Sequence, residues 1–177
     1  VGGFCLPKDI FLFNKMANKK LEGYKLFISR KINENSLKRI SFKIINLHKK
    51  NFSKKDKVLI LGASFKGLPE TIDIRNSPSI ALSKELTKNK IENHIFDIKG
   101  KEISKNNRHI NNFKFDQNLI KKYNFIILSN NNPTYSDLII EQISKNLNRN
   151  QKKIIFDCWN LIDSDVCQSS GYYYYTI

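Results

Sequence analysis

The residues best equipped for chemistry stand at the start of the sequence, where a cysteine is followed by a lysine and an aspartate. Cys5 comes directly after the glycine pair Gly2-Gly3 and Phe4, and Lys8 and Asp9 follow it. Glycine has no Cβ, so adjacent glycines let a ligand approach the backbone closely. A thiol just before a helix N-terminus feels the positive end of the helix dipole, which favours the thiolate form. Cys5 is therefore a candidate nucleophile, and the alternative interpretation is a small buried hydrophobic residue.

Two helices are predicted to position this motif. Pro7 suits the first turn of a helix, and apolar residues recur at helical spacing from there to about Leu21. After Gly23 a second helical pattern runs from Tyr24 to about Leu47, which corresponds to about 36 Å of helix at 1.5 Å per residue. This stretch carries more apolar residues than one packed stripe needs. We interpret its second face as a subunit interface, so residues 24–48 are predicted to form a homodimer contact; a core helix is the alternative.

Beyond a polar linker at 51–56 the pattern changes to short apolar runs that alternate with helical stretches. Helices are expected from Pro78 to about Lys88, with Ser77 as N-cap, and from Ser136 to Leu147, whereas 100–115 is expected to be irregular. Strands are expected at 58–61, 94–97, 125–128 and 154–157, with a fifth at 172–176. This alternation predicts an α/β fold, in which a long helix precedes a Rossmann-like, doubly wound parallel sheet.

In such sheets ligands bind beyond the carboxyl ends of the strands. Those ends are predicted at 62–67, Asp97, 129–132 and Asp157, all of them small or polar. The loop at 62–67 has the glycine spacing of a P-loop but lacks its lysine and Ser/Thr, and no GxGxxG follows the strand.

Two cations flank the first loop of this rim. Lys66 and Arg75 would suit a phosphate or carboxylate, and ion pairs with Glu70 or Asp73 are the alternative.

Composition narrows the possible classes of function. The chain carries 31 Lys+Arg against 16 Asp+Glu, a net charge of +15, but without a block of five like charges. A basic α/β module that binds nucleic acid or another polyanion is therefore the alternative function, whereas our preferred interpretation expects no nucleic-acid partner. The three cysteines and three histidines lack metal-ligand spacing, so no metal is expected. Free thiols, no apolar run of membrane-spanning length and no export signal lead us to expect a cytoplasmic protein without a membrane partner.

Two stretches resemble one family. The residues GGFCLPKD at 2–9 resemble the active-site motif of the UDP-glucose/GDP-mannose dehydrogenases. Residues 58–79, VLILGASFKGLPETIDIRNSPS, resemble the start of that family's C-terminal nucleotide-sugar-binding domain. Their order and the long helix between them agree with the family, in which this helix forms the dimer core.

The resemblance implies roles for the motif residues. Cys5 would attack the C6 aldehyde of a nucleotide sugar, and Asp9 would help to activate water for hydrolysis of the resulting thioester. Lys8 and Arg75 would contact the cofactor, NAD. The implied reaction is NAD-dependent oxidation of a UDP-hexose or UDP-N-acetylhexosamine to the uronic acid.

The resemblance also implies how substrate is bound and how the chain is divided. Gly2, Gly3 and Phe4 would wrap around the sugar nucleotide, while Phe65 and Lys66 would bind substrate. Residues 1–52 would end a central helical dimerisation domain and 53–177 would form the UDP/GDP-sugar-binding domain. The family's N-terminal NAD-binding domain is expected to be missing from this sequence, so we expect the 177-residue chain alone to be inactive. A degenerate relative with a purely oligomeric or regulatory role is a further alternative.

Overall fold

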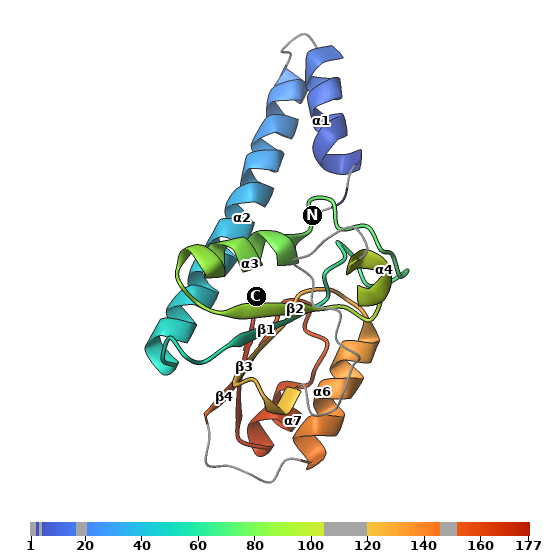
Figure 1. The fold of residues 1–177 in the computed structure, drawn as a ribbon. Coiled ribbons are helices and arrows are strands. Elements are labelled where there is room, and N and C mark those ends of the chain that lie inside the picture. Colours follow the sequence, from blue (N-terminus) through green and yellow to red (C-terminus); the bar gives the residue numbers. More distant parts are fainter. Residues whose placement is uncertain (1–2, 4, 17–20, 105–119, 146–151) are drawn as a thin grey trace.

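A helical hairpin projects from an α/β body in the computed structural model, which describes residues 3, 5–16, 21–104, 120–145 and 152–177 (Figure 1). The hairpin consists of α1 (Cys5–Met16) and α2 (Leu21–Asn51). The body then follows in chain order: β1 (Val58–Leu61), α3 (Pro78–Lys88), β2 (Asn93–Phe96), α4 (Gly100–Ser104), β3 (Phe125–Leu128), α6 (Pro133–Lys145), β4 (Lys153–Asp157), α7 (Ser164–Ser169) and β5 (Tyr172–Thr176).

The five strands form one all-parallel sheet in the order β2-β1-β3-β4-β5, which confirms the predicted fold class. The inner strands are short and almost wholly apolar because helices cover both faces. The strand order reverses between β1 and β3, so the carboxyl ends of these two strands are the expected place for a ligand.

Alternate residues of each strand enter two separate cores. On one face, Ile60 and Phe156 pack with Ile44 of α2 and Leu82 of α3. On the other face, the intervening strand residues pack against α6 and α7, where Tyr135 is the largest fully buried side chain. The sheet is therefore the middle layer of three.

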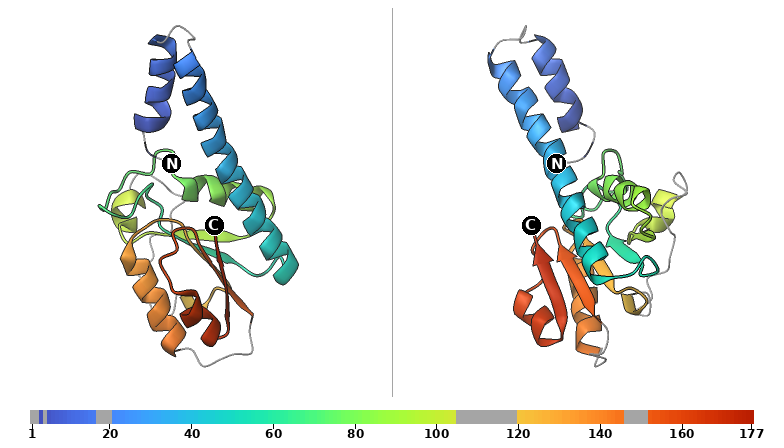
Figure 2. Two further views of the ribbon diagram at one scale, coloured as in Figure 1. Left: turned by 180° about the vertical axis from the view of Figure 1, so that it is seen from behind. Right: turned by 90° about the vertical axis from the view of Figure 1, so that its left-hand side faces the viewer.

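Helix α2 is longer than predicted, with 31 residues or roughly 46 Å. Its second half packs on the sheet, and Ile44 is fully buried. Its first half rises above the sheet beside α1 (Figure 2). Ile28 and Ile32 share the predicted apolar stripe with Ile44 but are 41% and 60% exposed, because the sheet does not reach that far along the helix.

Three local predictions need correction. Residues 100–104 form α4 instead of irregular structure, while 105–115 lie outside the described residues. Helix α7 was not predicted at all. Ser77 occupies the N-cap position of α3, but its hydroxyl makes no capping bond and donates instead to the Ala63 carbonyl at 2.6 Å.

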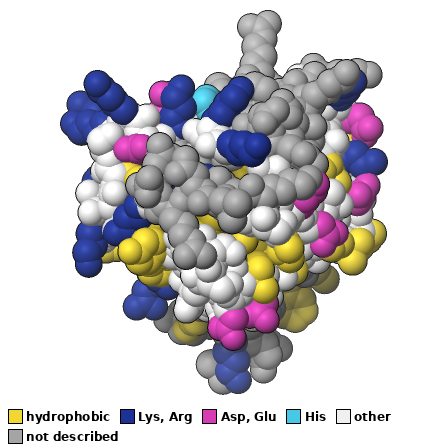
Figure 3. All heavy atoms as spheres, turned by 90° about the horizontal axis from the view of Figure 1, so that it is seen from below, with side chains coloured by type: hydrophobic (Ala, Val, Ile, Leu, Met, Phe, Trp, Pro, Cys, Tyr) yellow, Lys and Arg dark blue, Asp and Glu magenta, His cyan; other side chains and the backbone are white. Residues whose placement is uncertain are grey.

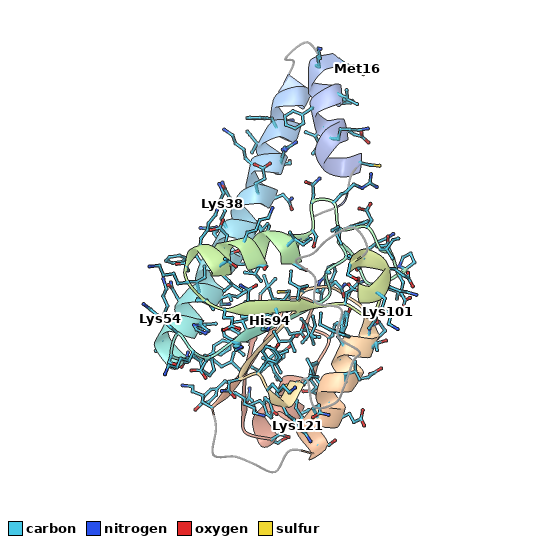
Figure 4. All side chains as sticks on the ribbon, viewed as in Figure 1. Met16, Lys38, Lys54, His94, Lys101 and Lys121 are labelled. Atoms are coloured by element: carbon cyan, nitrogen blue, oxygen red, sulfur yellow. The ribbon has the colours of Figure 1, made fainter. Side chains whose placement is uncertain are left out.

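Charged side chains are dispersed over the body. Lys54, Lys101 and Lys121 project from three different sides (Figure 4). Seen from below, Lys and Arg side chains are spread over the described surface, with acidic and hydrophobic ones between them (Figure 3). In the part of the chain that the structure describes, no helix has the length and apolar character needed to cross a bilayer.

Candidate functional site

The structure places Gly3 of the first motif against the loop that follows β1. The Gly3 amide donates to the Arg75 carbonyl at 3.2 Å, and the Asn76 side-chain amide donates to the Gly3 carbonyl at 2.9 Å. Gly3 has φ +89°, and a Cβ placed there would lie 3.1 Å from the Phe65 ring. A side chain is therefore excluded both by the left-handed backbone and by the ring. Residues more than sixty positions apart meet at this glycine.

Cys5 opens α1 as an exposed, free thiol near Arg75. The Arg75 guanidinium forms a two-pronged ion pair with Asp73, with Nη2–Oδ2 at 2.6 Å and Nε–Oδ1 at 2.9 Å. These hydrogen bonds raise the pKa of Arg75 and lower that of Asp73; the nearby Cys5 charge adds a smaller upward effect on Arg75. The predicted alternative, an ion pair between Arg75 and Asp73, is thus present.

Lys8 and Asp9 lie on the exposed side of α1. Their charged groups are 3.7 Å apart, and both side chains are more than half exposed. Within the described residues, Asp9 makes no hydrogen bond with Cys5. Cys5 and Asp9 are four positions apart on α1 and therefore lie on the same side of the helix. Gly2 and Phe4, also predicted for this site, lie outside the described residues.

Phe65 and Lys66 lie at the tip of the loop after β1, and both are partly buried. The Phe65 amide donates to the Asp73 carbonyl at 3.0 Å, which closes the loop back on itself. The Lys66 ammonium lies 5.5 Å from the centre of the Phe65 ring. No carboxylate of the described residues lies within ion-pair distance of Lys66.

The loops after β1 and β3 are packed into direct contact. A Cβ on Gly62 would lie 2.4 Å from the Asn130 side chain, and one on Gly67 would lie 2.2 Å from the Asn132 amide nitrogen. The Asn131 side chain accepts a hydrogen bond from the Gly67 amide at 2.8 Å. The two loops therefore pack closely on one another at the carboxyl ends of β1 and β3.

The two aspartates at strand ends hold loops in place. Asp97 accepts hydrogen bonds from the amides of Ala63 and Ser64 at 2.7 and 3.0 Å. Asp157 accepts from the amides of Leu161 and Ile162 at 2.7 and 3.0 Å. Both carboxylates are buried. The sequence predicts both aspartates as part of a binding rim, and in the structure their carboxylates hold the backbone of the rim loops in place.

A cavity of about 360 Å³ opens beside the Gly3 contact, between α2, α3 and the loop after β4. Asn76 and Pro78 line it at the start of α3, Leu37 lines it on α2, and Trp159 closes it on the side of the sheet. Trp159 was not among the predicted site residues. The available signal was that the only tryptophan of the chain lies two residues beyond the end of a predicted strand.

The chemistry of the thiol motif and the parallel sheet define the class: a Rossmann-like α/β domain with a cysteine-bearing helix at its ligand rim. Residues 59–164 match the model of the "UDP-glucose/GDP-mannose dehydrogenase family, UDP binding domain". The chain belongs to this family.

The curated relatives agree with this family. The chain is 27% identical over 180 residues to UDP-glucose 6-dehydrogenase of Rickettsia conorii. The aligned region covers 99% of this chain and 40% of that protein. It is 25% identical over 177 residues to UDP-N-acetyl-D-mannosamine dehydrogenase of Methanococcus maripaludis, covering 97% and 38%. The chain thus spans about 40% of the length of these relatives.

Solved structures share the fold. The UDP-D-ManNAc dehydrogenase of Pyrococcus horikoshii superposes with a TM-score of 0.73 at 24% identity, covering 100% of this chain and 38% of that one. The NDP-N-acetyl-D-galactosaminuronic acid dehydrogenase of Methanosarcina mazei gives 0.73 at 19% identity, with the same coverage.

Proposed function

We propose that this chain supplies the nucleophilic cysteine and the sugar-nucleotide-binding portion of an NAD-dependent nucleotide-sugar 6-dehydrogenase. Its substrate would be a UDP-hexose or UDP-N-acetylhexosamine, and its product the uronic acid. The observation that carries this proposal is the contact of Gly3 with Phe65, Arg75 and Asn76, because it puts the thiol helix at the rim of a UDP-binding domain.

Oxidation of a primary alcohol to an acid removes two hydrides, and the intermediate aldehyde must not escape. In the proposed reaction the Cys5 thiolate adds to the C6 aldehyde and forms a thiohemiacetal, which becomes a thioester on loss of the second hydride. Water then attacks the thioester with help from Asp9, which releases the carboxylate and returns the thiol. Covalent capture at an exposed thiol fits this sequence, since the carbon must reach Cys5 from the rim.

Two molecules of NAD would accept the hydrides, one in each oxidation step. Lys8 follows Cys5 by three positions, and Arg75 lies near Cys5 in the fold; both are exposed cations whose chemistry suits cofactor phosphates. Because Arg75 is already paired with Asp73, a phosphate would join an existing ion pair and find the guanidinium held in place. On the substrate side, Lys66 offers a charge to the diphosphate or to the uronate, beside the aromatic ring of Phe65.

The exposed apolar side chains of α2 support a homodimer through residues 24–48. Ile28, Ile32 and Phe42 are 41%, 60% and 67% exposed on a helix that reaches beyond the sheet. Burying such residues against a second copy would remove apolar surface from water. We accordingly propose 1–52 as the end of a dimerisation domain and 53–177 as the nucleotide-sugar-binding domain.

The test compares Cys5→Ser with Cys167→Ala in an enzyme that contains this chain together with an NAD-binding portion. We expect Cys5→Ser to abolish uronic acid formation and leave UDP-glucose binding, measured by calorimetry, largely intact. Cys167 lies in the core away from the rim, so its variant should keep activity. Acid formation by Cys5→Ser would contradict the proposal. Binding to an oligonucleotide that weakens steeply with salt, without binding of UDP-sugar, would support the polyanion module instead.

A further inference from the structure

Trp159 is fixed at the wall of the cavity by hydrogen bonds to two strand ends. Its indole N–H donates to the Ser129 carbonyl at 3.1 Å, and its backbone amide donates to the Asp157 carboxylate at 2.9 Å. The side chain nevertheless remains 47% exposed. A half-exposed indole whose N–H is already satisfied presents its apolar ring to whatever enters.

The other walls suit a planar ring with polar edges. Leu37 and Pro78 are apolar, and Asn76 adds a side-chain amide at the edge. A volume of about 360 Å³ lies within the range of small-molecule pockets, for which mostly apolar walls and a few polar groups are typical. A nucleobase has this combination of flat aromatic faces and hydrogen-bonding edges.

Asn76 connects this cavity to the thiol motif. It lines the cavity, and its side-chain amide also donates to the Gly3 carbonyl. A ligand whose reacting end lies near Cys5 and whose flat end lies in the cavity would therefore pass Asn76. A nucleotide sugar has both ends: a hexose that could react at Cys5, and a base, joined to it through a diphosphate, that could enter the cavity.

We propose that Trp159 stacks against the nucleobase of the nucleotide sugar and so acts as a specificity-determining residue for the base end. This inference rests on the proposed function for the identity of the ligand. The α2 side of the cavity lies within residues 24–48, the proposed homodimer contact, so a second copy of the chain that inserts a side chain into the cavity is the competing occupant. It is less favoured, because the cavity is continuous with the Gly3 contact through Asn76.

The test uses the fact that Trp159 is the only tryptophan of the chain. Its fluorescence should change on titration with UMP and with UDP-glucose but not with ribose 5-phosphate, which lacks the base. By calorimetry, Trp159→Ala should weaken UMP binding roughly 5- to 150-fold, as loss of one base–aromatic stack predicts. Trp159→Phe keeps a ring and should remain within about fivefold of the wild type. Tyr173→Ala, which removes a half-exposed aromatic ring on β5, is the matched control and should bind as the wild type does.

The outcomes are separable. Wild-type affinity of Trp159→Ala for UMP would overturn the stacking role and leave the proposed function standing. Absence of any binding of UDP-glucose or UMP to the wild type would overturn both. A change of sedimentation velocity in both Trp159 variants, without loss of UMP affinity, would assign the cavity to a second copy and overturn the inference. Circular dichroism of each variant separates loss of binding from loss of fold, and Trp159→Phe supplies the comparison if Trp159→Ala does not fold.

Discussion

The three thiols of this chain should differ sharply toward an alkylating reagent. Cys5 is exposed at the start of α1, whereas Cys158 is partly buried and Cys167 is fully buried in the core. Burial raises the pKa of Cys158 to about 12 and that of Cys167 to about 11, and the neighbouring Asp157 charge adds to both increases. Because the thiolate is the reacting form, iodoacetamide should discriminate among them.

The magnitude follows from these values. At about pH 8 a thiol with a pKa of about 12 is ionised in roughly one molecule in ten thousand, and one with a pKa of about 11 in roughly one in a thousand. Restricted access to the buried sulfur of Cys167 slows its reaction further. The native chain should therefore take up one equivalent, on Cys5, long before a second is detectable. Below these pKa values, each increase of one pH unit should raise the rates at Cys158 and Cys167 about tenfold.

Intact-mass spectrometry against time, followed by peptide mapping, measures this selectivity. Native Cys5→Ser should remain unlabelled over the period in which the wild type is fully labelled once. In guanidinium chloride all three cysteines should react. UDP-glucose should slow labelling of Cys5 if the proposed site is correct. Labelling of native Cys158 at the rate of Cys5 would show that the loop after β4 is open, and it would refute the burial on which this reasoning depends.

Two further predictions concern the loops that build the rim, and a third concerns Asp56 in the loop that precedes β1. Gly67→Ala should lower the free energy of unfolding by about 1–3 kcal/mol in urea titrations, because the new Cβ overlaps the backbone nitrogen of Asn132; an unchanged value would contradict the contact. Asp157→Asn should cost about 3 kcal/mol in the same assay, since two buried amides lose a charged acceptor, and full stability would refute that role. Hydrogen bonds from Ser53 lower the pKa of Asp56 in the folded chain. Ionised Asp56 therefore stabilises the fold fully at pH values above the ordinary carboxyl pKa near 3.8, and this stabilisation is lost as the pH falls through the lowered pKa of the folded chain. The melting temperature of Asp56→Asn should therefore fall below that of the wild type at about pH 7 and converge with it at about pH 2.

The strands could be predicted because a short segment of sequence is enough to identify each of them. Runs such as 58–61 and 125–128 are wholly apolar, and a short run of this kind is stable only when both faces of the strand are covered. Helix α7 could not be predicted in this way. It is six residues long, and its sequence SDVCQS gives no helical periodicity; its start is fixed by Asp163, whose side chain accepts from the Asp165 amide.

The sequence also could not predict which part of α2 packs on the sheet. Ile28 and Ile44 have the same character and belong to the same predicted stripe, yet one is 41% exposed and the other fully buried. Periodicity reports which side of a helix is apolar, not how far its partner extends. The predicted dimer contact and the predicted boundary at 52/53 stay predictions for the same reason, since both depend on what covers the first half of the helix.

Some residues of the candidate site could be predicted from the sequence, and others could not. Cys5 and Lys66 could be selected by residue type, but the contact of Gly3 with Phe65 joins segments more than sixty residues apart and needs the fold. Trp159 escaped prediction because the sequence does not show whether a tryptophan beyond a strand end is buried in the core or lines a cavity. Its half-exposed position follows from the Ser129 carbonyl, which is supplied by a neighbouring strand.

The rim is rich in carboxylates, and an anionic ligand would be repelled there if these charges faced outward. These carboxylates are instead compensated by hydrogen bonds and ion pairs within the fold. Asp97 is surrounded by backbone amides of the loop after β1, Glu70 pairs with Lys99 at 3.1 Å, and Asp73 pairs with Arg75. Lys66, among the described residues of this rim, has no such carboxylate partner. Compensated anions beside an uncompensated cation would suit the diphosphate of the proposed substrate, and this arrangement arises from loop geometry rather than from the net charge of +15.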